Sequence, residues 1–259
     1  MTRLIAIASG KGGVGKTVMT ANLGTALAQL GKKVIMVDAD LDMANLELVL
    51  GMEGRPITLQ DVLNGEAHLQ DTIYDAPGGA KFVPAGISPQ QFKRVDPEKL
   101  AKMISDLTAY ADIILLDCPA GIGRDTIACF SACKEVILVM TPEPMSATDA
   151  FKSKITAEKM GAETIGIVLN MIRGLKSEMK EEDITSLMGT SILARVKDDS
   201  ELREKTQRGK VLVLESPQNE SAMAISKFAA DLVGGTFQPS QVKKPSFFSK
   251  LFGAFKRKK

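Results

Sequence analysis

One short stretch decides the fold: Gly10-Lys11-Gly12-Gly13-Val14-Gly15-Lys16-Thr17. It follows an apolar run, Leu4–Ala8, and opens a segment with helical periodicity, Thr17–Leu30. The stretch fits the pattern G-x-x-x-x-G-K-[ST] in the strand–loop–helix context that the pattern requires. Glycines let the backbone wrap closely around an anion, and the N–H groups at a helix start attract negative charge. The sequence therefore predicts a phosphate-binding loop, the alternative being a glycine turn between a strand and a helix.

The loop predicts a nucleotide site with ATP and Mg²⁺ as the expected cofactors. Lys16 would neutralise the β- and γ-phosphates, and the Thr17 hydroxyl would ligate Mg²⁺. The backbone amide of Val18 would reach the α-phosphate. The loop residues that we expect to contact the nucleotide are Gly10, Lys11, Gly12, Gly13, Val14, Gly15, Lys16, Thr17 and Val18.

Short apolar runs alternate with helix-period segments along the rest of the chain, which is typical of βαβ units. This alternation predicts an α/β fold with a mainly parallel sheet and helices on both faces, and together with the phosphate-binding loop it predicts the three-layer P-loop NTPase type. The expected strands are Leu4–Ala8, Val34–Val37, Ile113–Leu116, Val136–Met140 and Ile165–Leu169, and the expected helices are Thr17–Leu30, Pro97–Ala109, Ser146–Lys159, Ser177–Met188 and Asn219–Val233.

Lys11 is a second lysine that the general loop pattern does not require. With it, the stretch K-G-G-V-G-K-T resembles the deviant Walker A loop of the MinD/ParA family of ATPases. The resemblance implies that Lys11 reaches across an ATP-dependent homodimer to the phosphates of the partner subunit. A charge supplied in this way also stabilises the transition state of hydrolysis, so Lys11 and Lys16 are both expected to be catalytic. The alternative is a solvated lysine on the loop.

Two carboxylates at a predicted strand end, Asp38 and Asp40, resemble the first switch of that family. The resemblance implies that Asp40 positions the attacking water and that Asp38 lies near the hydration shell of Mg²⁺. Two carboxylates that face phosphates are costly without a cation, which favours the presence of Mg²⁺. The alternative is that both residues cap the next helix.

Three further positions match the family's pattern. The run Ile113–Leu116 ends at Asp117, which would hold Mg²⁺ through water or through Thr17. Gly121 would place its amide near the γ-phosphate. Asn170 matches the position at which family members read the edge of adenine, because an amide both donates and accepts there. The alternative for Asn170 is a turn at the strand end.

The C-terminal residues differ in charge and pattern from the rest of the chain. Seven of the 33 Lys and Arg residues, and none of the 31 Asp and Glu residues, lie between Lys243 and Lys259, which leaves residues 1–242 with a net charge of −5. We therefore expect an ATPase domain over 1–234, a flexible linker over 235–246 and an amphipathic, basic, membrane-targeting helix over 247–259. Its membrane-facing residues are expected to be Phe247, Phe248, Leu251, Phe252, Phe255, Lys256, Arg257, Lys258 and Lys259.

This tail resembles the MinD branch of the family more than the ParA branch. The expected protein is an ATPase that cycles between the cytoplasm and the anionic inner face of the cell membrane, acting with a protein partner in positioning such as division-site placement. One alternative is a nucleotide-locked membrane scaffold with little turnover, because Val18, Gly123 and Lys197 depart from residues that are common in relatives. A DNA-partition ATPase is a further alternative, but the acidic body makes a nucleic-acid partner unlikely. The tail itself could instead dock on the protein's own surface or bind RNA.

Overall fold

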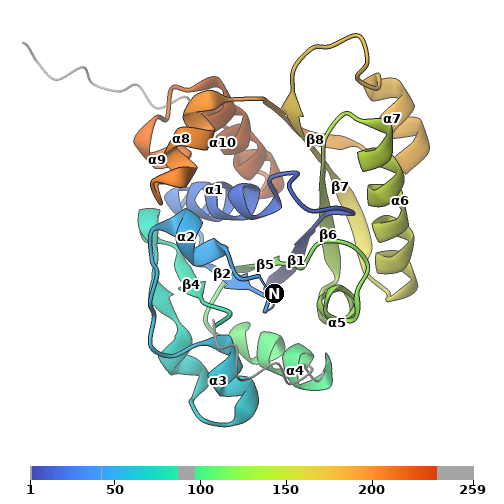
Figure 1. Cartoon of the computed structure of the whole chain (residues 1–259). Coiled ribbons are helices and arrows are strands. Elements are labelled where there is room, and N and C mark those ends of the chain that lie inside the picture. The colour runs from blue at the N-terminus through green and yellow to red at the C-terminus, as the bar shows by residue number, and fades with distance from the viewer. Residues whose placement is uncertain (1, 42, 87–96, 238–259) are drawn as a thin grey trace, which may run out of the picture.

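The computed structural model describes residues 2–41, 43–86 and 97–237 of the chain. Within them, eight strands form one sheet in the order β3-β4-β2-β5-β1-β6-β7-β8 (Figure 1). Neighbouring strands are parallel, except that β3 and β4 are antiparallel at one edge. The strands are β1 (Arg3–Ala8), β2 (Val34–Asp38), β3 (Tyr74–Asp75), β4 (Lys81–Val83), β5 (Ile113–Asp117), β6 (Glu135–Met140), β7 (Glu163–Ile172) and β8 (Ile192–Lys197).

Helices cover both faces of this sheet (Figure 1). The helices α1, α2, α8, α9 and α10 pack on one face, and α3 to α7 pack on the other. Two short 3₁₀ helices, Leu69–Thr72 and Pro77–Gly79, flank β3. The α-helices are α1 (Lys16–Gln29), α2 (Leu46–Leu50), α3 (Leu59–Asn64), α4 (Pro97–Leu107), α5 (Arg124–Ala132), α6 (Pro144–Lys159), α7 (Glu181–Met188), α8 (Ser200–Gln207), α9 (Leu212–Glu215) and α10 (Glu220–Leu232).

The central strand β1 shows why the runs of apolar residues are continuous. Ile5 and Ile7 enter the core on the α1 side of the sheet, whereas Ala6 and Ala8 enter the core on the other side. A strand with both faces buried needs apolar residues at every position. The predicted three-layer α/β fold with a mainly parallel sheet is confirmed.

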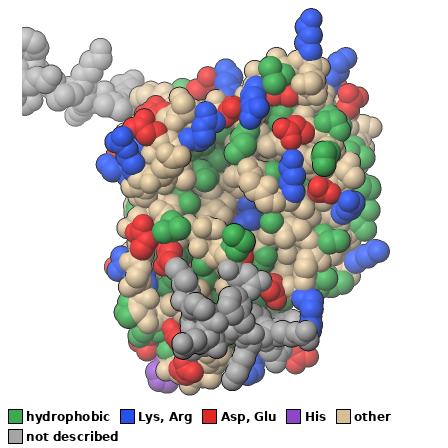
Figure 2. All heavy atoms as spheres, viewed as in Figure 1, with side chains coloured by type: hydrophobic (Ala, Val, Ile, Leu, Met, Phe, Trp, Pro, Cys, Tyr) green, Lys and Arg blue, Asp and Glu red, His purple; other side chains and the backbone are tan. Residues whose placement is uncertain are grey.

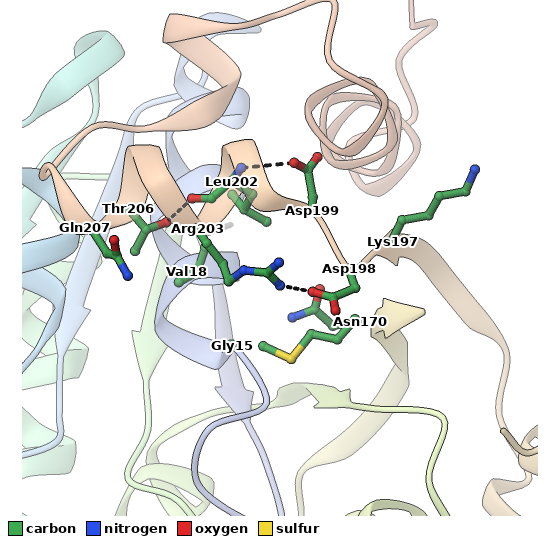
Figure 3. A pocket seen from close by; sticks show the side chains of 11 residues that line it. Gly15, Val18, Asn170, Lys197, Asp198, Asp199, Leu202, Arg203, Thr206 and Gln207 are labelled. Carbon is green, nitrogen blue, oxygen red and sulfur yellow. Dashed lines mark hydrogen bonds and ion pairs between the residues drawn. The ribbon is translucent and has the colours of Figure 1, made fainter. Parts of the chain in front are cut away.

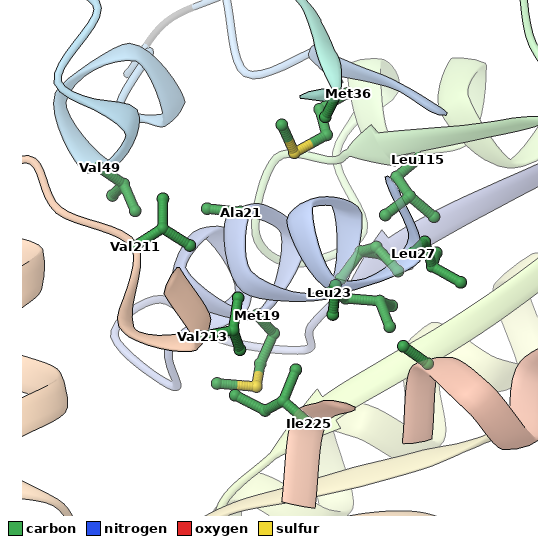
Figure 4. Close-up of a cluster of buried hydrophobic side chains, with 14 of the residues drawn as sticks. Met19, Ala21, Leu23, Leu27, Met36, Val49, Leu115, Val211, Val213 and Ile225 are labelled. Carbon is green, nitrogen blue, oxygen red and sulfur yellow. The ribbon is translucent and has the colours of Figure 1, made fainter. Parts of the chain in front are cut away.

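Helix α1 lies deep in its layer, between the sheet and α10 (Figure 4). Met19, Leu23 and Leu27 are buried along it. A Cβ at Gly24 would lie 2.4 Å from the sulfur of Met36 in β2, so glycine is required for the close approach of helix and sheet. The helix that follows the phosphate-binding loop is therefore held rigidly against the strands that end beside it.

Several elements differ from the expectations. The sequence patterns did not reveal β3, β4 and β8 or the helices α2, α3, α5, α8 and α9, because these elements are short or carry polar residues on an exposed face. The edge strand β8, for example, alternates between buried and more exposed residues. The helix expected over Ser177–Met188 begins only at Glu181.

Some expectations cannot be compared with the structure. The predicted helix 247–259, and the linker beyond residue 237, lie outside the described residues. Within the part of the chain that is described, no helix has both the length and the apolar composition needed to cross a bilayer. On the face shown in Figure 2, Lys and Arg side chains are interspersed with Asp and Glu.

Candidate functional site

The phosphate-binding loop connects β1 to α1 at the carboxyl edge of the sheet. Gly13 and Gly15 have φ angles of 80° and 88°, which favour glycine. A Cβ at Gly12 or Gly13 would meet nothing within 4 Å, so the loop is open where an anion would lie. At Gly10, a Cβ would lie 2.1 Å from the backbone carbonyl carbon of Asp149 in α6. Packing against α6 therefore suffices to explain Gly10, without the predicted nucleotide contact.

A buried ion pair lies beneath the loop. The Nζ atom of Lys16 is 2.8 Å from Oδ1 of Asp117 at the end of β5, and both side chains are buried. The hydroxyl of Thr20, one turn along α1, donates to the same carboxylate oxygen at 3.0 Å. Burial opposes the charged form of Lys16, but the neighbouring Asp117 raises the lysine pKa above its usual value. Lys16 therefore keeps its positive charge beneath the loop, and the Thr17 hydroxyl lies 3.5 Å from it.

The second buried carboxylate, Asp38, organises the loop that follows β2. Its Oδ1 accepts the backbone N–H of Asp40 at 3.1 Å, and its Oδ2 accepts those of Asn45 and Leu46 at 3.1 and 2.9 Å. Burial, with a further contribution from the negative charge of Asp117, raises the pKa of Asp38 to about 7. These bonds match the capping alternative, and they leave Asp38 beside Asp117, where a cation would be stabilised.

Asp40 lies on the same loop and is more exposed than Asp38. Its Oδ1 accepts the backbone N–H of Met43 at 3.0 Å, which also fits a local turn-forming role. The predicted role of Asp40 in positioning water stays a prediction.

Lys11 bonds to a residue that the sequence did not indicate. Its Nζ atom lies 3.1 Å from Oε2 of Glu143, which directly precedes α6. The hydrogen bond from Lys11, rather than burial, lowers the pKa of the Glu143 carboxyl. Both side chains are partly exposed, so the pair is weak and exchangeable. The Lys11 side chain is thus not free in solvent, and in this structure it extends from the loop toward the start of α6.

Gly121 follows β5 and adopts a φ of 84°. Its backbone N–H donates to the carbonyl of Ser9, immediately before the phosphate-binding loop, at 2.8 Å. The expected contact of this amide with the γ-phosphate stays a prediction. The bond couples the loop after β5 to the phosphate-binding loop.

A pocket of about 230 Å³ continues from the phosphate-binding loop between β7, β8 and α8 (Figure 3). Asn170 is buried at its base and donates from Nδ2 to the carbonyl of Val14 at 2.7 Å. The Oδ1 atom of Asn170 is buried and has no hydrogen-bond partner among the described residues. The remaining lining residues are Gly15, Val18, Met171, Lys197, Asp198, Asp199, Leu202, Arg203, Thr206 and Gln207.

The backbone around Asn170 is held in an unusual shape. Met171 has a φ of 57°, the only positive value at a non-glycine residue in the described ranges. The pairing of β7 with β8 is also irregular between Leu169 and Ile172. A Cβ at Gly15 would lie 2.4 Å from Nδ2 of Asn170, so the last glycine of the loop is required by the packing of that amide. Strained backbone of this kind is concentrated at functional sites.

These features fit a nucleotide with its metal ion. The open glycines and Lys16 suit phosphates, Asp38 and Asp117 suit a cation, and the pocket lined by Asn170 lies beside the loop, where a base would follow the phosphates. The sequence anticipated these residues but missed Thr20, Glu143 and Arg203. The spacing of Thr20 from Lys16 by one helical turn was an available signal, whereas Glu143 and Arg203 become neighbours of the site only through folding. The fold and loop together define a P-loop nucleotide-binding protein.

Comparison with known proteins identifies the family of this chain. Residues 5–213 match the family described as the CobQ/CobB/MinD/ParA nucleotide binding domain, and the chain belongs to this family. An uncharacterized ATP-binding protein of Methanocaldococcus jannaschii is 40% identical over 260 residues, which cover 100% of this chain and 98% of that protein.

Two solved structures are similar to the whole fold. The septum site-determining protein MinD of Pyrococcus horikoshii, complexed with Mg-ADP, has a TM-score of 0.85 and 39% identity, covering 90% of this chain and 96% of that one. MinD of Aquifex aeolicus, in a complex of MinC with MinD, has a TM-score of 0.81 and 32% identity, covering 92% and 98%.

Proposed function

We propose that this protein binds Mg-ATP, dimerises, associates with an anionic membrane through its C-terminal residues and is released when ATP is hydrolysed. It would act in spatial positioning such as division-site placement, together with a protein partner. The observation that carries the proposal is the buried pair of Lys16 and Asp117 beneath an open glycine loop, with a pocket lined by Asn170 beside it.

The phosphate end of the proposal rests on charge. Lys16 is held near the loop by Asp117, and it would turn toward the β- and γ-phosphates when these arrive. Mg²⁺, held by Thr17 with Asp38 and Asp117 nearby, would neutralise charge on the phosphates. Asp40 would orient the attacking water. The Mg-ADP complex of the Pyrococcus relative supports this assignment of ligands.

The dimer is supported by an apolar surface at the edge of the sheet where the loop lies. Exposed large side chains follow the ends of four strands: Met43 after β2, Ile122 after β5, Met145 after β6 and Leu175 after β7. Exposed apolar groups that gather at one edge favour a protein partner. A second copy of the chain would cover them and would bring its own Lys11 to the nucleotide.

The membrane step rests on the sequence of the tail. Burial of its five large apolar side chains would contribute roughly 10 kcal/mol as an upper bound. Ordering a dozen residues costs about 1 kcal/mol each, so a single tail should bind weakly and reversibly. Two tails on one dimer gain about a hundredfold or more from effective concentration. ATP would therefore control membrane binding by controlling dimerisation.

Sedimentation with anionic liposomes tests the proposal. The protein should be a dimer with Mg-ATP and a monomer with Mg-ADP, and it should sediment with the liposomes only in ATP. A protein that stays monomeric in ATP, or that coats the liposomes equally without nucleotide, would contradict it.

A membrane scaffold with little turnover is a second candidate. Val18, Gly123 and Lys197 favour it, because at these positions the chain departs from residues that are common in its relatives. Phosphate release measured with and without anionic liposomes distinguishes the two: stimulated release supports a cycling ATPase, whereas nucleotide-dependent membrane binding without release supports the scaffold. DNA partition would instead give ATP-dependent DNA binding that survives deletion of residues 245–259.

A further inference from the structure

An arginine, Arg203, lines the pocket beside Asn170. Arg203 lies in the first turn of α8, and its side chain extends toward Asp198, as Figure 3 shows. The guanidinium donates through Nη1 to Oδ1 of Asp198. The Oδ2 atom of Asp198 accepts from Nε of Arg173 at 2.9 Å, and its backbone N–H donates to the carbonyl of Ile172. Asp198 is therefore fixed to the end of β7 and positions the guanidinium of Arg203 from there.

The helix that carries Arg203 is fixed as well. Asp199 caps α8, its Oδ1 accepting the backbone N–H groups of Glu201 and Leu202 at 2.8 and 3.1 Å. An exposed arginine usually samples many rotamers, but this one is held at its backbone and at its guanidinium. Lys197, the other cation that lines the pocket, points away from it in Figure 3 and pairs with Glu220 at 2.8 Å. Of the lining residues, only Arg203 thus holds a cation beside the pocket.

We infer that Arg203 binds the nucleobase by stacking its planar guanidinium on the face of the ring, while Asn170 reads the ring's edge. The inference rests on the proposed function and adds a residue that binds the face of the base. A guanidinium is planar and weakly hydrated, so it stacks on aromatic faces in a way that a lysine ammonium cannot. Because every nucleobase has such a face, Arg203 would increase affinity without selecting among bases, and selection would depend on Asn170.

The test separates base binding from phosphate binding. The experiment compares wild type with Arg203→Ala, Arg203→Lys and Asn170→Leu. For each protein we would measure the dissociation constants of Mg-ATP and Mg-GTP. We would also measure the inhibition constant of tripolyphosphate as a competitor of ATP. Arg208→Ala is the matched control, because Arg208 pairs with Glu204 at the end of the same helix and does not line the pocket.

Arg203→Ala should weaken ATP and GTP by a similar factor of about 3 to 30 and leave tripolyphosphate unchanged. Arg203→Lys should recover little of this loss, whereas Asn170→Leu should change the ratio of ATP to GTP affinity. Any of three results would overturn the inference: ATP affinity that is unchanged in Arg203→Ala, tripolyphosphate affinity that falls as much as ATP affinity, or ATP affinity that Arg203→Lys restores fully. If wild type binds none of the three ligands, the proposed function fails instead. Thermal unfolding checks that each variant is folded.

Discussion

Asp38 and Asp117 lie directly opposite each other, in register, at the ends of the parallel strands β2 and β5. Both carboxylates are buried, and the cation nearest to them, Lys16, bonds to Asp117. The fold therefore holds more negative charge at this point than one lysine balances. We expect the imbalance to make the stability of the nucleotide-free protein depend on pH, and it suits the site to a divalent cation.

The first prediction concerns the stability of the nucleotide-free protein without Mg²⁺. Asp38 has a pKa of about 7 in the fold, against an ordinary value of 3.8. Between these values the folded state binds the proton more tightly, so the contribution of Asp38 to stability is greatest at low pH and falls as pH rises toward 7. From pH 5 to pH 8, wild type should lose about 2–4 kcal/mol more of its free energy of unfolding than Asp38→Asn does. Urea unfolding at several pH values measures the difference.

The comparison of slopes matters here, because Asp38→Asn also removes an acceptor of backbone N–H groups and lowers stability at every pH. Asp112→Asn is a suitable control, since Asp112 is an exposed carboxylate just before β5, at the opposite end of that strand. The free energy of unfolding of Asp112→Asn should change with pH as steeply as that of wild type. Parallel slopes for wild type and Asp38→Asn would show that Asp38 does not carry the pH dependence.

The second prediction concerns the buried ion pair. Lys16→Ala should lower the free energy of unfolding by about 3 kcal/mol, because it leaves Asp117 buried without its cation. Adding Asp117→Asn should recover part of this loss, since the neutral amide is less costly to bury. A double-mutant cycle by urea unfolding gives the coupling, expected at about 1–3 kcal/mol. If the two substitutions change the free energy of unfolding additively, Lys16 and Asp117 do not stabilise the fold as a pair.

The fold and most of the site could be predicted from local patterns. The phosphate-binding loop, the five central strands and the strand-end carboxylates each follow from a few adjacent residues whose chemistry is specific. The contact between Gly15 and Asn170 could be predicted only in part. The loop pattern requires Gly15, but its packing against the Asn170 amide arises because β7 ends beside the loop. Patterns of adjacent residues indicated this position without indicating its packing.

Partnerships between distant residues could not be predicted in this way. Lys11 bonds to Glu143, and Asp198 to Arg173, only because the ends of β1, β6, β7 and β8 lie at the same edge of the sheet. Glu143 has no distinguishing pattern around it, and a charged residue near a helix start is common on any surface. The short elements β3 and β4 were missed for a related reason, since two or three residues carry too little periodicity to be recognised.

The third prediction follows from the bond between Lys11 and Glu143. If Lys11 must leave Glu143 to reach a partner subunit, Glu143→Ala should favour the ATP-dependent dimer by up to about fivefold, since an exposed pair contributes at most about 1 kcal/mol. Lys11→Ala should retain nucleotide and lose the dimer. Glu158→Ala, which breaks an exposed pair with Lys154 farther along α6, is the control. Sedimentation equilibrium with Mg-ATP measures all three, and a weaker dimer in Glu143→Ala would show that Glu143 supports assembly instead.

The last prediction tests the tail with two substitutions that add the same charge. Helical spacing places Phe252 on the apolar face of the expected helix and Ser249 on the polar face. Ser249→Asp should weaken binding of the ATP-bound protein to anionic liposomes only about fivefold, through repulsion by the headgroups. Phe252→Asp should weaken it more than thirtyfold, because it also removes a buried ring and places a carboxylate among lipid tails. Nucleotide affinity should be unchanged in both. Equal losses in the two variants would mean that charge alone holds the tail to the surface, in which case an RNA-binding tail would explain the residues as well as a membrane helix does.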